Sequence, residues 1–228
     1  MKDMKVVHVI AVGMNKDRIM ESLKMSGYPI QKAYLAMPKS KEYESVAEEL
    51  EKALSVLVEI EKIYVDESDV YGSAIKILSA LKKEKDEGNQ IYINATDAPR
   101  TLMISCYITA QLVDGKMYVA LPKYEGGKEV GVDKIVEIPV PPLKKIGEDK
   151  LRILKAIYNN GKEVDSINSL IKLIEGKLEK QKAYMAQRAK MSYHLKGLEK
   201  DGLIEMRRDG KNVRITLTPL GEAFCTIN

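Results

Sequence analysis

The chain has 228 residues, and 45% of them are hydrophobic, which suffices for the core of one large domain or two small ones and excludes a largely disordered chain. The longest apolar runs are too short to span a bilayer and the N-terminus lacks the features of a secretory signal, so we expect a cytoplasmic protein without membrane contact. The net charge is +4. The two cysteines and the two histidines lie far apart in the sequence, and this spacing predicts no disulfide framework and no metal site; we also expect no cofactor.

The first two-thirds of the sequence alternates apolar strand patterns with helical ones. Strands are predicted at residues 6–12, 30–37, 61–65, 90–94, 116–121 and 134–140, and helices at 18–26, 42–57, 70–85 and 98–113. A glycine-rich, polar hairpin or loop is predicted at 124–133. Strands separated by helices of this length indicate βαβ units, and therefore an α/β fold with a Rossmann-like, mostly parallel sheet.

Two polar loops follow the first and fourth of these strands, at residues 13–17 and 94–100. Ligands of open α/β sheets bind outside the carboxyl ends of the strands, so these loops predict a ligand site. We expect Asp97 or Thr96 to cap the following helix, Pro99 to lie in its first turn, and Arg100 to help attract an anion there. A capped strand-to-helix turn without a ligand explains residues 94–100 equally well. The predicted ligand-binding residues are Gly13, Asn15, Lys16, Asn94, Thr96, Asp97 and Arg100.

Prolines at positions 139, 141 and 142 mark a border, because proline removes amide donors and fixes φ. The segment suits a semi-rigid, extended linker. We therefore predict an α/β domain over residues 1–140, a linker over 141–148 and a second domain over 149–228.

The C-terminal third predicts a winged helix-turn-helix domain. Helices are predicted at 149–158, at 167–175 with Ser166 as cap, and over a longer stretch that ends at Lys200; strands at 203–207 and 213–217 and a short final helix follow. The connection before the long helix takes in residues 176–184. Residues 149–228 hold 16 Lys and Arg against 10 Asp and Glu, whereas residues 1–148 hold 21 against 23. This basic excess would attract DNA, although ordinary surface solubility explains it too.

Within the long helix, Met191, Leu195 and Leu198 recur at helical spacing and are predicted to be core, and His194 is predicted to pack rather than to read bases. The wide major groove admits a helix, and a basic hairpin can lie along the phosphate backbone. The fold could also serve protein contacts or dimerisation. The predicted DNA-binding residues are Arg188, Lys190, Ser192, Tyr193, Lys196, Arg207, Arg208, Lys211 and Arg214.

Two strings in this region match known regulators. Ser192, His194, Leu195, Leu198, Gly202, Leu203 and Ile204 form one, and the run from Arg214 to Gly221 closes the wing. Residues 149–226 resemble the winged helix-turn-helix of archaeal and bacterial regulators of the ArsR and MarR groups. The resemblance implies that double-stranded DNA is a partner.

The N-terminal string of Asn94, Thr96 and Arg100, with a winged helix appended, resembles the CARF domain, the Rossmann-like sensor of CRISPR-associated proteins. The family's usual string is Asn-x-Thr-Gly-Gly-Thr-Lys; here Asp97 and Ala98 replace the glycine pair and Pro99 replaces the threonine. The resemblance implies a largely archaeal, homodimeric transcriptional regulator that binds a cyclic oligoadenylate or related nucleotide at its two-fold axis. The Asp97 carboxylate would repel a phosphate, which leaves a different ligand open.

Two other functions stay open at this point. Some CARF domains cleave the cyclic nucleotide they bind, and Lys16, Thr96 and Arg100 could position a ribose hydroxyl and stabilise developing charge. The sequence has no P-loop, paired-carboxylate signature or nucleophile elbow, so we expect no enzyme. A winged-helix repressor that responds to another small metabolite is the remaining alternative.

Overall fold

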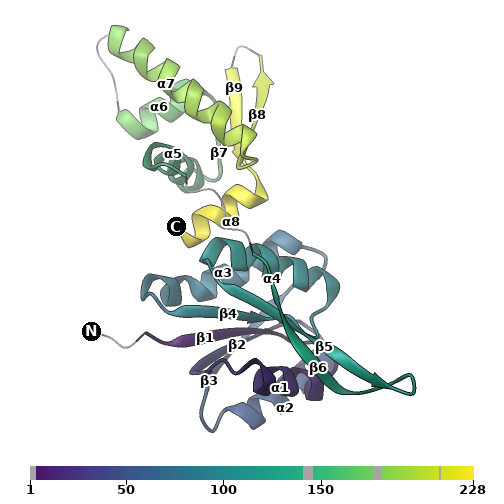
Figure 1. Ribbon diagram of the computed structural model, residues 1–228. Helices are drawn as coiled ribbons and strands as arrows, with labels where there is room; N and C mark the ends of the chain where they lie inside the picture. Colours follow the sequence, from purple (N-terminus) through teal and green to yellow (C-terminus); the bar gives the residue numbers. More distant parts are fainter. Residues whose placement is uncertain (1–3, 141–145, 177–180, 211) are drawn as a thin grey trace. The chain divides into compact units, whose positions relative to one another are not determined.

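A computed structural model of the chain describes residues 4–140, 146–176, 181–210 and 212–228 (Figure 1). The chain divides into two compact units, one built on Met1–Leu143 and the other on Lys144–Thr226. The division falls in the predicted linker, of which residues 141–145 lie outside the described residues.

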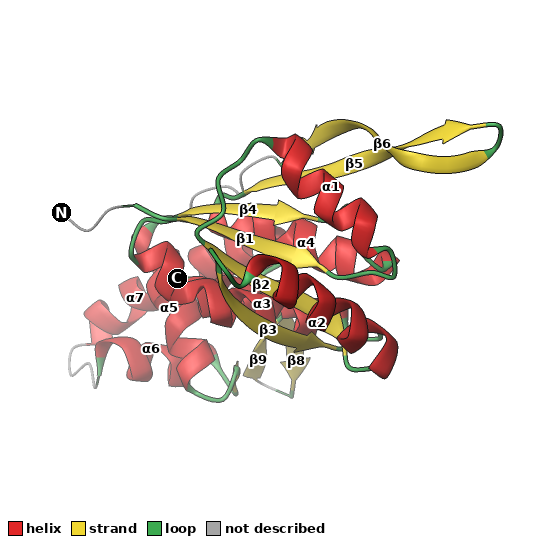
Figure 2. Cartoon of the chain, turned by 90° about the horizontal axis from the view of Figure 1, so that it is seen from below, coloured by secondary structure: helices red, strands yellow, loops and turns green. Residues whose placement is uncertain are grey.

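The first unit contains a six-stranded sheet with the strand order β3-β2-β1-β4-β5-β6 (Figure 2). Strands β1 to β5 pair in parallel, and β6 pairs antiparallel with β5. The direction of the strand order reverses between β1 and β4, and this topological switch point is where open sheets bind ligands. The strands are β1 (Val6–Ala11), β2 (Lys32–Pro38), β3 (Glu59–Val65), β4 (Gln90–Asn94), β5 (Lys116–Glu125) and β6 (Lys128–Ile138).

Helices cover both faces of this sheet, with α1 and α2 on one side and α3 and α4 on the other (Figure 2). The central strands β1 and β2 are buried on both faces, which explains their continuous apolar sequence. The predicted α/β class with a mostly parallel sheet is confirmed. The helices are α1 (Lys16–Ser26), α2 (Lys41–Leu54), α3 (Val70–Asp86) and α4 (Arg100–Val113).

Strands β5 and β6 form one long hairpin that extends beyond the rest of the sheet (Figure 2). Residues 124–133, predicted as a hairpin or loop, are largely strand. Gly126 and Gly127 make the turn with φ of 57° and 80°, and the register shifts after Leu121 and after Lys123. The glycines thus serve the tight turn and an irregular, strongly twisted ladder.

The second unit has the element order of a winged helix. Its three strands pair antiparallel in the order β7-β9-β8, and the short β7 was not predicted. Residues 181–184, predicted as part of the connection before the long helix, belong to α7; residues 177–180 lie outside the described part of the chain. The elements are α5 (Glu148–Asn159), β7 (Glu163–Val164), α6 (Ile167–Glu175), α7 (Gln181–Lys200), β8 (Ile204–Asp209), β9 (Asn212–Leu217) and α8 (Pro219–Ile227).

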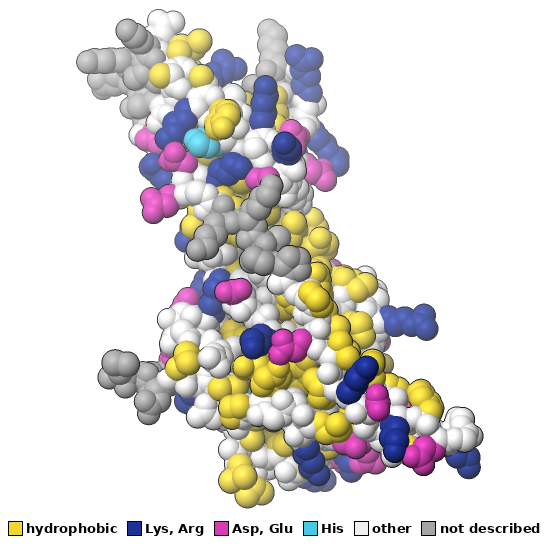
Figure 3. Space-filling model, viewed as in Figure 1, with side chains coloured by type: hydrophobic (Ala, Val, Ile, Leu, Met, Phe, Trp, Pro, Cys, Tyr) yellow, Lys and Arg dark blue, Asp and Glu magenta, His cyan; other side chains and the backbone are white. Residues whose placement is uncertain are grey.

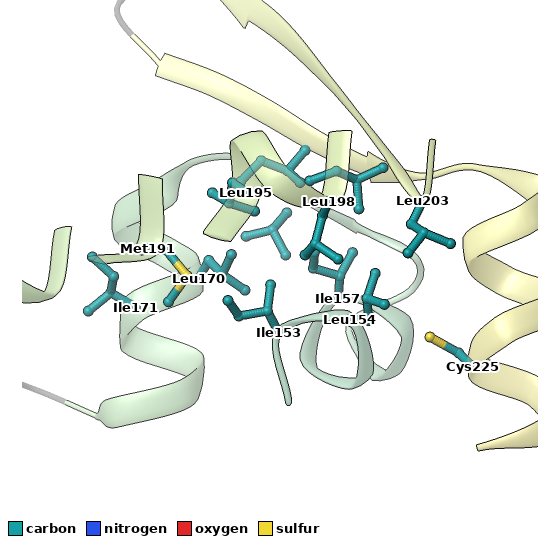
Figure 4. Packing of buried hydrophobic residues seen from close by; sticks show 13 residues of the cluster. Ile153, Leu154, Ile157, Leu170, Ile171, Met191, Leu195, Leu198, Leu203 and Cys225 are labelled. Atoms are coloured by element: carbon teal, nitrogen blue, oxygen red, sulfur yellow. The ribbon is translucent and has the colours of Figure 1, made fainter. Parts of the chain in front are cut away.

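The core of this unit joins all three helices of the helix-turn-helix (Figure 4). Met191, Leu195 and Leu198 of α7 are at most 6% exposed, as their spacing predicts. They pack on Ile153 and Leu170, among other residues of α5 and α6. Truncating one of these leucines to alanine would cost about 2–5 kcal/mol, so this face fixes the rotation of α7 about its axis.

Candidate functional site

The exposed face of α7 carries basic and polar side chains. Arg188, Ser192 and Lys196 lie four residues apart and therefore on one side of the helix; Arg188 and Lys196 are exposed and Ser192 is partly so. Tyr193 beside them is 75% exposed. No acidic residue occurs in the sequence from 181 to 198. Figure 3 shows Lys and Arg side chains over α7 and the neighbouring hairpin.

Lys190 lies on a different side of α7. Two residues correspond to about 200° of helix rotation, which turns Lys190 away from Arg188. Its Nζ lies 2.9 Å from the carboxylate of Asp149 on α5, and His194 Nε2 lies 3.5 Å from the same carboxylate. The hydrogen bond to Lys190 lowers the pKa of Asp149. The structure thus places Lys190 and His194 at the packing of α7 against α5.

Arg188 lines a hollow between the start of α6 and the end of the wing. The side chain of Ser166 caps α6, as predicted, and accepts a hydrogen bond of 3.0 Å from the Ser169 N–H. The helix, the cap and the hairpin thus meet around one arginine. The lining residues are Ser166, Ile167, Asn168, Arg188, Asn212 and Val213.

The wing arginines point to two faces of the β8–β9 hairpin. Arg207 pairs with Arg214, and Arg208 pairs with Val213. Cross-strand partners share a face and neighbours along a strand alternate, so Arg208 lies on the face of Val213 and the buried Ile215. That face is the one that borders α7.

The other face carries Arg207 and Arg214, each near a carboxylate. Arg207 Nη2 lies 2.9 Å from Glu205 Oε2, and Arg214 Nη2 lies 3.7 Å from Asp165 Oδ1. Arg208 forms no ion pair with any side chain that the structure describes. Lys211, at the turn, lies outside the described residues.

In the first unit, the two predicted ligand loops meet at the switch point. The backbone N–H of Asn15 donates to Asp97 Oδ2 at 2.7 Å, and the Asn15 side chain caps α1 by accepting from the Arg18 N–H. A Cβ on Gly13 would lie 1.7 Å from the carbonyl oxygen of Asp97. Glycine at position 13 is therefore required by the close approach of the loops.

Arg18, which was not predicted, links these loops to the β5–β6 hairpin. Its Nη1 lies 2.8 Å from Asp97 Oδ1, and its Nε donates to Glu129 Oε1 at 2.7 Å. The hydrogen bond to Glu129 raises the pKa of Arg18 and lowers that of Glu129. The partners are 79 and 111 positions away, so no local pattern pointed to them.

Asn94 and Thr96 shape the loop after β4. Asn94 is 1% exposed, and its Nδ2 donates to Ser22 Oγ at 2.7 Å. Its Oδ1 accepts from both the N–H and the hydroxyl of Thr96, and the Thr96 hydroxyl oxygen accepts from the Ala120 N–H. These contacts give both residues a positioning role; their contact with a ligand stays a prediction.

The predicted capping of α4 is wrong. Pro99 is the N-cap residue, and no side chain caps the helix, because Thr96 and Asp97 bond elsewhere. Arg100 begins α4, is exposed and forms no ion pair within the described chain. Lys16 begins α1, and its Nζ lies 2.7 Å from Glu49 Oε2, which raises the pKa of Lys16.

Comparisons with known proteins identify both units. Residues 6–125 match the family model described as "HFX_2341_N:-like, N-terminal", and residues 149–228 match the "DUF6293 C-terminal winged helix domain". The chain belongs to this HFX_2341-like family. An uncharacterized protein of Archaeoglobus fulgidus is 48% identical over 218 residues, which cover 96% of each chain. The second match confirms that the C-terminal domain of this HFX_2341-like protein is a winged helix.

Two solved structures have a distant likeness to the HFX_2341-like chain. Protein VC1899 from Vibrio cholerae aligns with 12% identity and a TM-score of 0.42 over 97% of this chain and 66% of that one. Can2 from Sulfobacillus thermosulfidooxidans, solved in complex with cyclic tetra-adenylate, aligns with 10% identity and a TM-score of 0.40 over 97% of this chain and 61% of that one. The chain thus spans about two-thirds of each structure's length.

Within the described part of this HFX_2341-like protein, no helix combines the length and the hydropathy that a membrane crossing needs. Nor do three or more His, Cys, Asp or Glu side chains of those residues gather as metal ligands would.

Proposed function

We propose that this protein is a ligand-responsive transcriptional regulator whose winged helix binds double-stranded DNA. The observation that carries the proposal is the exposed, acid-free face of α7 with Arg188, Ser192 and Lys196, beside Arg208 of the wing. A helix of this kind fits the major groove, while the wing follows the backbone. Arg188 and Lys196 supply phosphate or guanine contacts, and Ser192 and Tyr193 reach base edges.

We propose further that the regulator is a homodimer joined through α4 and the β5–β6 hairpin. Residues 101–113 of α4 carry no charge, and Met103 and Ile104 are 38% and 52% exposed. Leu121 and Tyr124 add exposed apolar surface on β5, and Figure 3 shows hydrophobic side chains over this part of the first unit. Exposed apolar residues of this kind are typical of an interaction site. One winged helix reads one half-site, so a symmetric dimer would read two.

For the first unit we propose ligand binding at the switch point without turnover. The resemblance to CARF sensors makes a cyclic oligoadenylate or related nucleotide the first ligand to test, in a regulator of the CRISPR-associated type. A ring-nuclease function has less support, because the side chains of Lys16 and Thr96 already bond to Glu49 and Asn94. A different metabolite is the second candidate, and the Asp97 carboxylate at the switch point favours it.

Fluorescence anisotropy with a labelled duplex tests the DNA-binding proposal. The double variant Arg188→Ala with Lys196→Ala should bind at least tenfold more weakly. Its plot of log K against log salt should be shallower by about two, because each phosphate contact contributes about 0.9 to the slope. Lys155→Ala, which removes an exposed lysine of α5, is the matched control and should bind like the parent. An unchanged affinity of the double variant would refute the proposed interface.

Incubation with cyclic tetra-adenylate separates the ligand hypotheses. Binding without products, measured by calorimetry and chromatography, supports a nucleotide sensor. Cleavage products would support the ring nuclease, and the absence of both binding and cleavage would support another metabolite.

A further inference from the structure

We propose that Asp97 is a specificity-determining residue whose carboxylate occupies the anion position at the switch point and thereby excludes phosphate from it. The proposal concerns the ligand class of the first unit. It goes beyond DNA binding and does not depend on it.

The carboxylate has the contacts that a bound anion would have. One oxygen accepts the backbone N–H of Asn15, the N-cap residue of α1, at 2.7 Å. The other lies 2.8 Å from Nη1 of Arg18. Backbone N–H groups at a helix start and a guanidinium are the donors by which proteins hold phosphates and carboxylates. Both donors are taken by a side chain of the same protein.

The neighbouring loop is shaped around this carboxylate. A Cβ on Gly13 would lie 2.3 Å from Asp97 Oδ2, a distance that real Cβ contacts do not reach. The backbone of the first loop therefore passes against the carboxylate itself, as well as against the Asp97 carbonyl group. A phosphate that used the same donors as Asp97 would have to displace this side chain.

The charges nearby oppose such a displacement. Arg18 already contacts the carboxylates of Asp97 and Glu129, and Lys16 is paired with Glu49. The pKa of Tyr43 is raised first by burial and then by the negative charges of Glu67, Asp97 and Glu42. Two further carboxylates, those of Glu67 and Glu42, therefore lie near Tyr43 together with Asp97. Arg18 and Lys16 are therefore each already neutralised by a carboxylate.

The ligand class follows from these charges. A ligand that fits meets Asp97 with a neutral or cationic hydrogen-bond donor, such as an amide or an amine. Any phosphate that it carries lies away from Arg18.

Inorganic phosphate is the probe, titrated against the full-length protein at constant ionic strength with chloride as the reference anion. Thermal shift and calorimetry compare the parent with Asp97→Ala and Asp97→Asn. The parent should show no saturable response to phosphate. Asp97→Ala should bind phosphate at least tenfold more tightly than the parent, about the contribution of one hydrogen bond to a charged group. Asp97→Asn keeps the shape and removes the charge, so it should fall between the two.

Two further variants locate the effect. Adding Arg18→Ala to Asp97→Ala should abolish the gained phosphate binding. Asp86→Asn is the matched control, because Asp86 is exposed at the end of α3, beside the amino end of β4 and so at the opposite edge of the sheet, and it should respond like the parent. If Asp97→Ala fails to fold, the isosteric Asp97→Asn decides. The proposal is overturned if the parent binds phosphate as tightly as the variants, or if a folded variant gains nothing.

Discussion

Arg207 and Arg208 are adjacent in β8, yet their replacement by alanine should have different effects on DNA binding. Arg208 lies on the hairpin face that borders α7, whereas Arg207 lies on the opposite face and contacts Glu205 at 2.9 Å. A phosphate bound along α7 is within the reach of the first face alone. Arg208→Ala should therefore weaken binding, and Arg207→Ala should leave it nearly unchanged.

The expected magnitudes follow from these surroundings. Arg208 has no carboxylate partner among the described side chains, so it can neutralise one phosphate. Its loss should reduce the salt slope by about 0.9 and the affinity by about tenfold, which corresponds to about 1.4 kcal/mol. The Arg207 side chain is 81% exposed, and an exposed ion pair such as that with Glu205 contributes about 0–1 kcal/mol to stability. Arg207→Ala should therefore change the affinity by less than about threefold.

Anisotropy titrations of both variants on one duplex, repeated over a series of salt concentrations, give both quantities. Circular dichroism should show that each variant keeps the parent's secondary structure. The reasoning fails if Arg207→Ala loses as much affinity as Arg208→Ala, or if Arg208→Ala keeps the parent's salt slope.

Three further predictions concern the first unit. Burial lowers the pKa of His8 from 6.5 to about 4, so the unfolded chain takes up this proton first, and the free energy of unfolding falls by about 3 kcal/mol as the pH drops from 6.5 towards 4. In urea unfolding, His8→Gln should show a flatter pH dependence than the parent, and a parallel curve would contradict this. In the same assay, Gly13→Ala should destabilise the unit by about 3 kcal/mol, because the added Cβ meets the Asp97 backbone. Gly27→Ala should cost about 1 kcal/mol, because its Cβ meets nothing within 4 Å but its φ is 67°; equal losses in the two variants would count against the close approach of the loops. If the protein is the proposed dimer, Ile104→Glu should convert it into a monomer in light scattering at micromolar concentration, whereas Leu57→Glu, at a site 88% exposed, should not. An unchanged mass for the first variant would exclude α4 from the proposed interface.

The sequence predicted the fold wherever a local pattern determined the structure. The bounds of β4 and α6 match their predictions, because an apolar run ends at a turn in the first case and Ser166 caps an amphipathic segment in the second. The hairpin was among the forms predicted for residues 124–133, but the lengths of β5 and β6 were underestimated because Gly126, Gly127 and Gly131 suggested loop residues. Their positive φ serves a turn and a bulged strand instead.

The sites were less predictable because their contacts are not local. Asp97 was expected to cap α4, but Arg18 and the Asn15 N–H, about 80 positions away, bind its carboxylate. Lys190 was grouped with Arg188, although helix phase places it about 200° from both Arg188 and Ser192. That its side is the one facing α5 is known only from its contact with Asp149, which is distant in the sequence.

The division of α7 into a packed face and an exposed face bears on how the proposed DNA-binding surface can evolve. Side chains that hold the helix, such as Leu195 and Leu198, are separate from those that face outward, such as Arg188 and Ser192. Substitutions at the outward positions leave the core packing intact, and surface changes of this kind usually alter stability by less than about 0.5 kcal/mol. If this face reads an operator, as we propose, its sequence preference can drift among relatives while the scaffold keeps its stability, so duplicated copies of such a gene could acquire separate targets through a few outward substitutions.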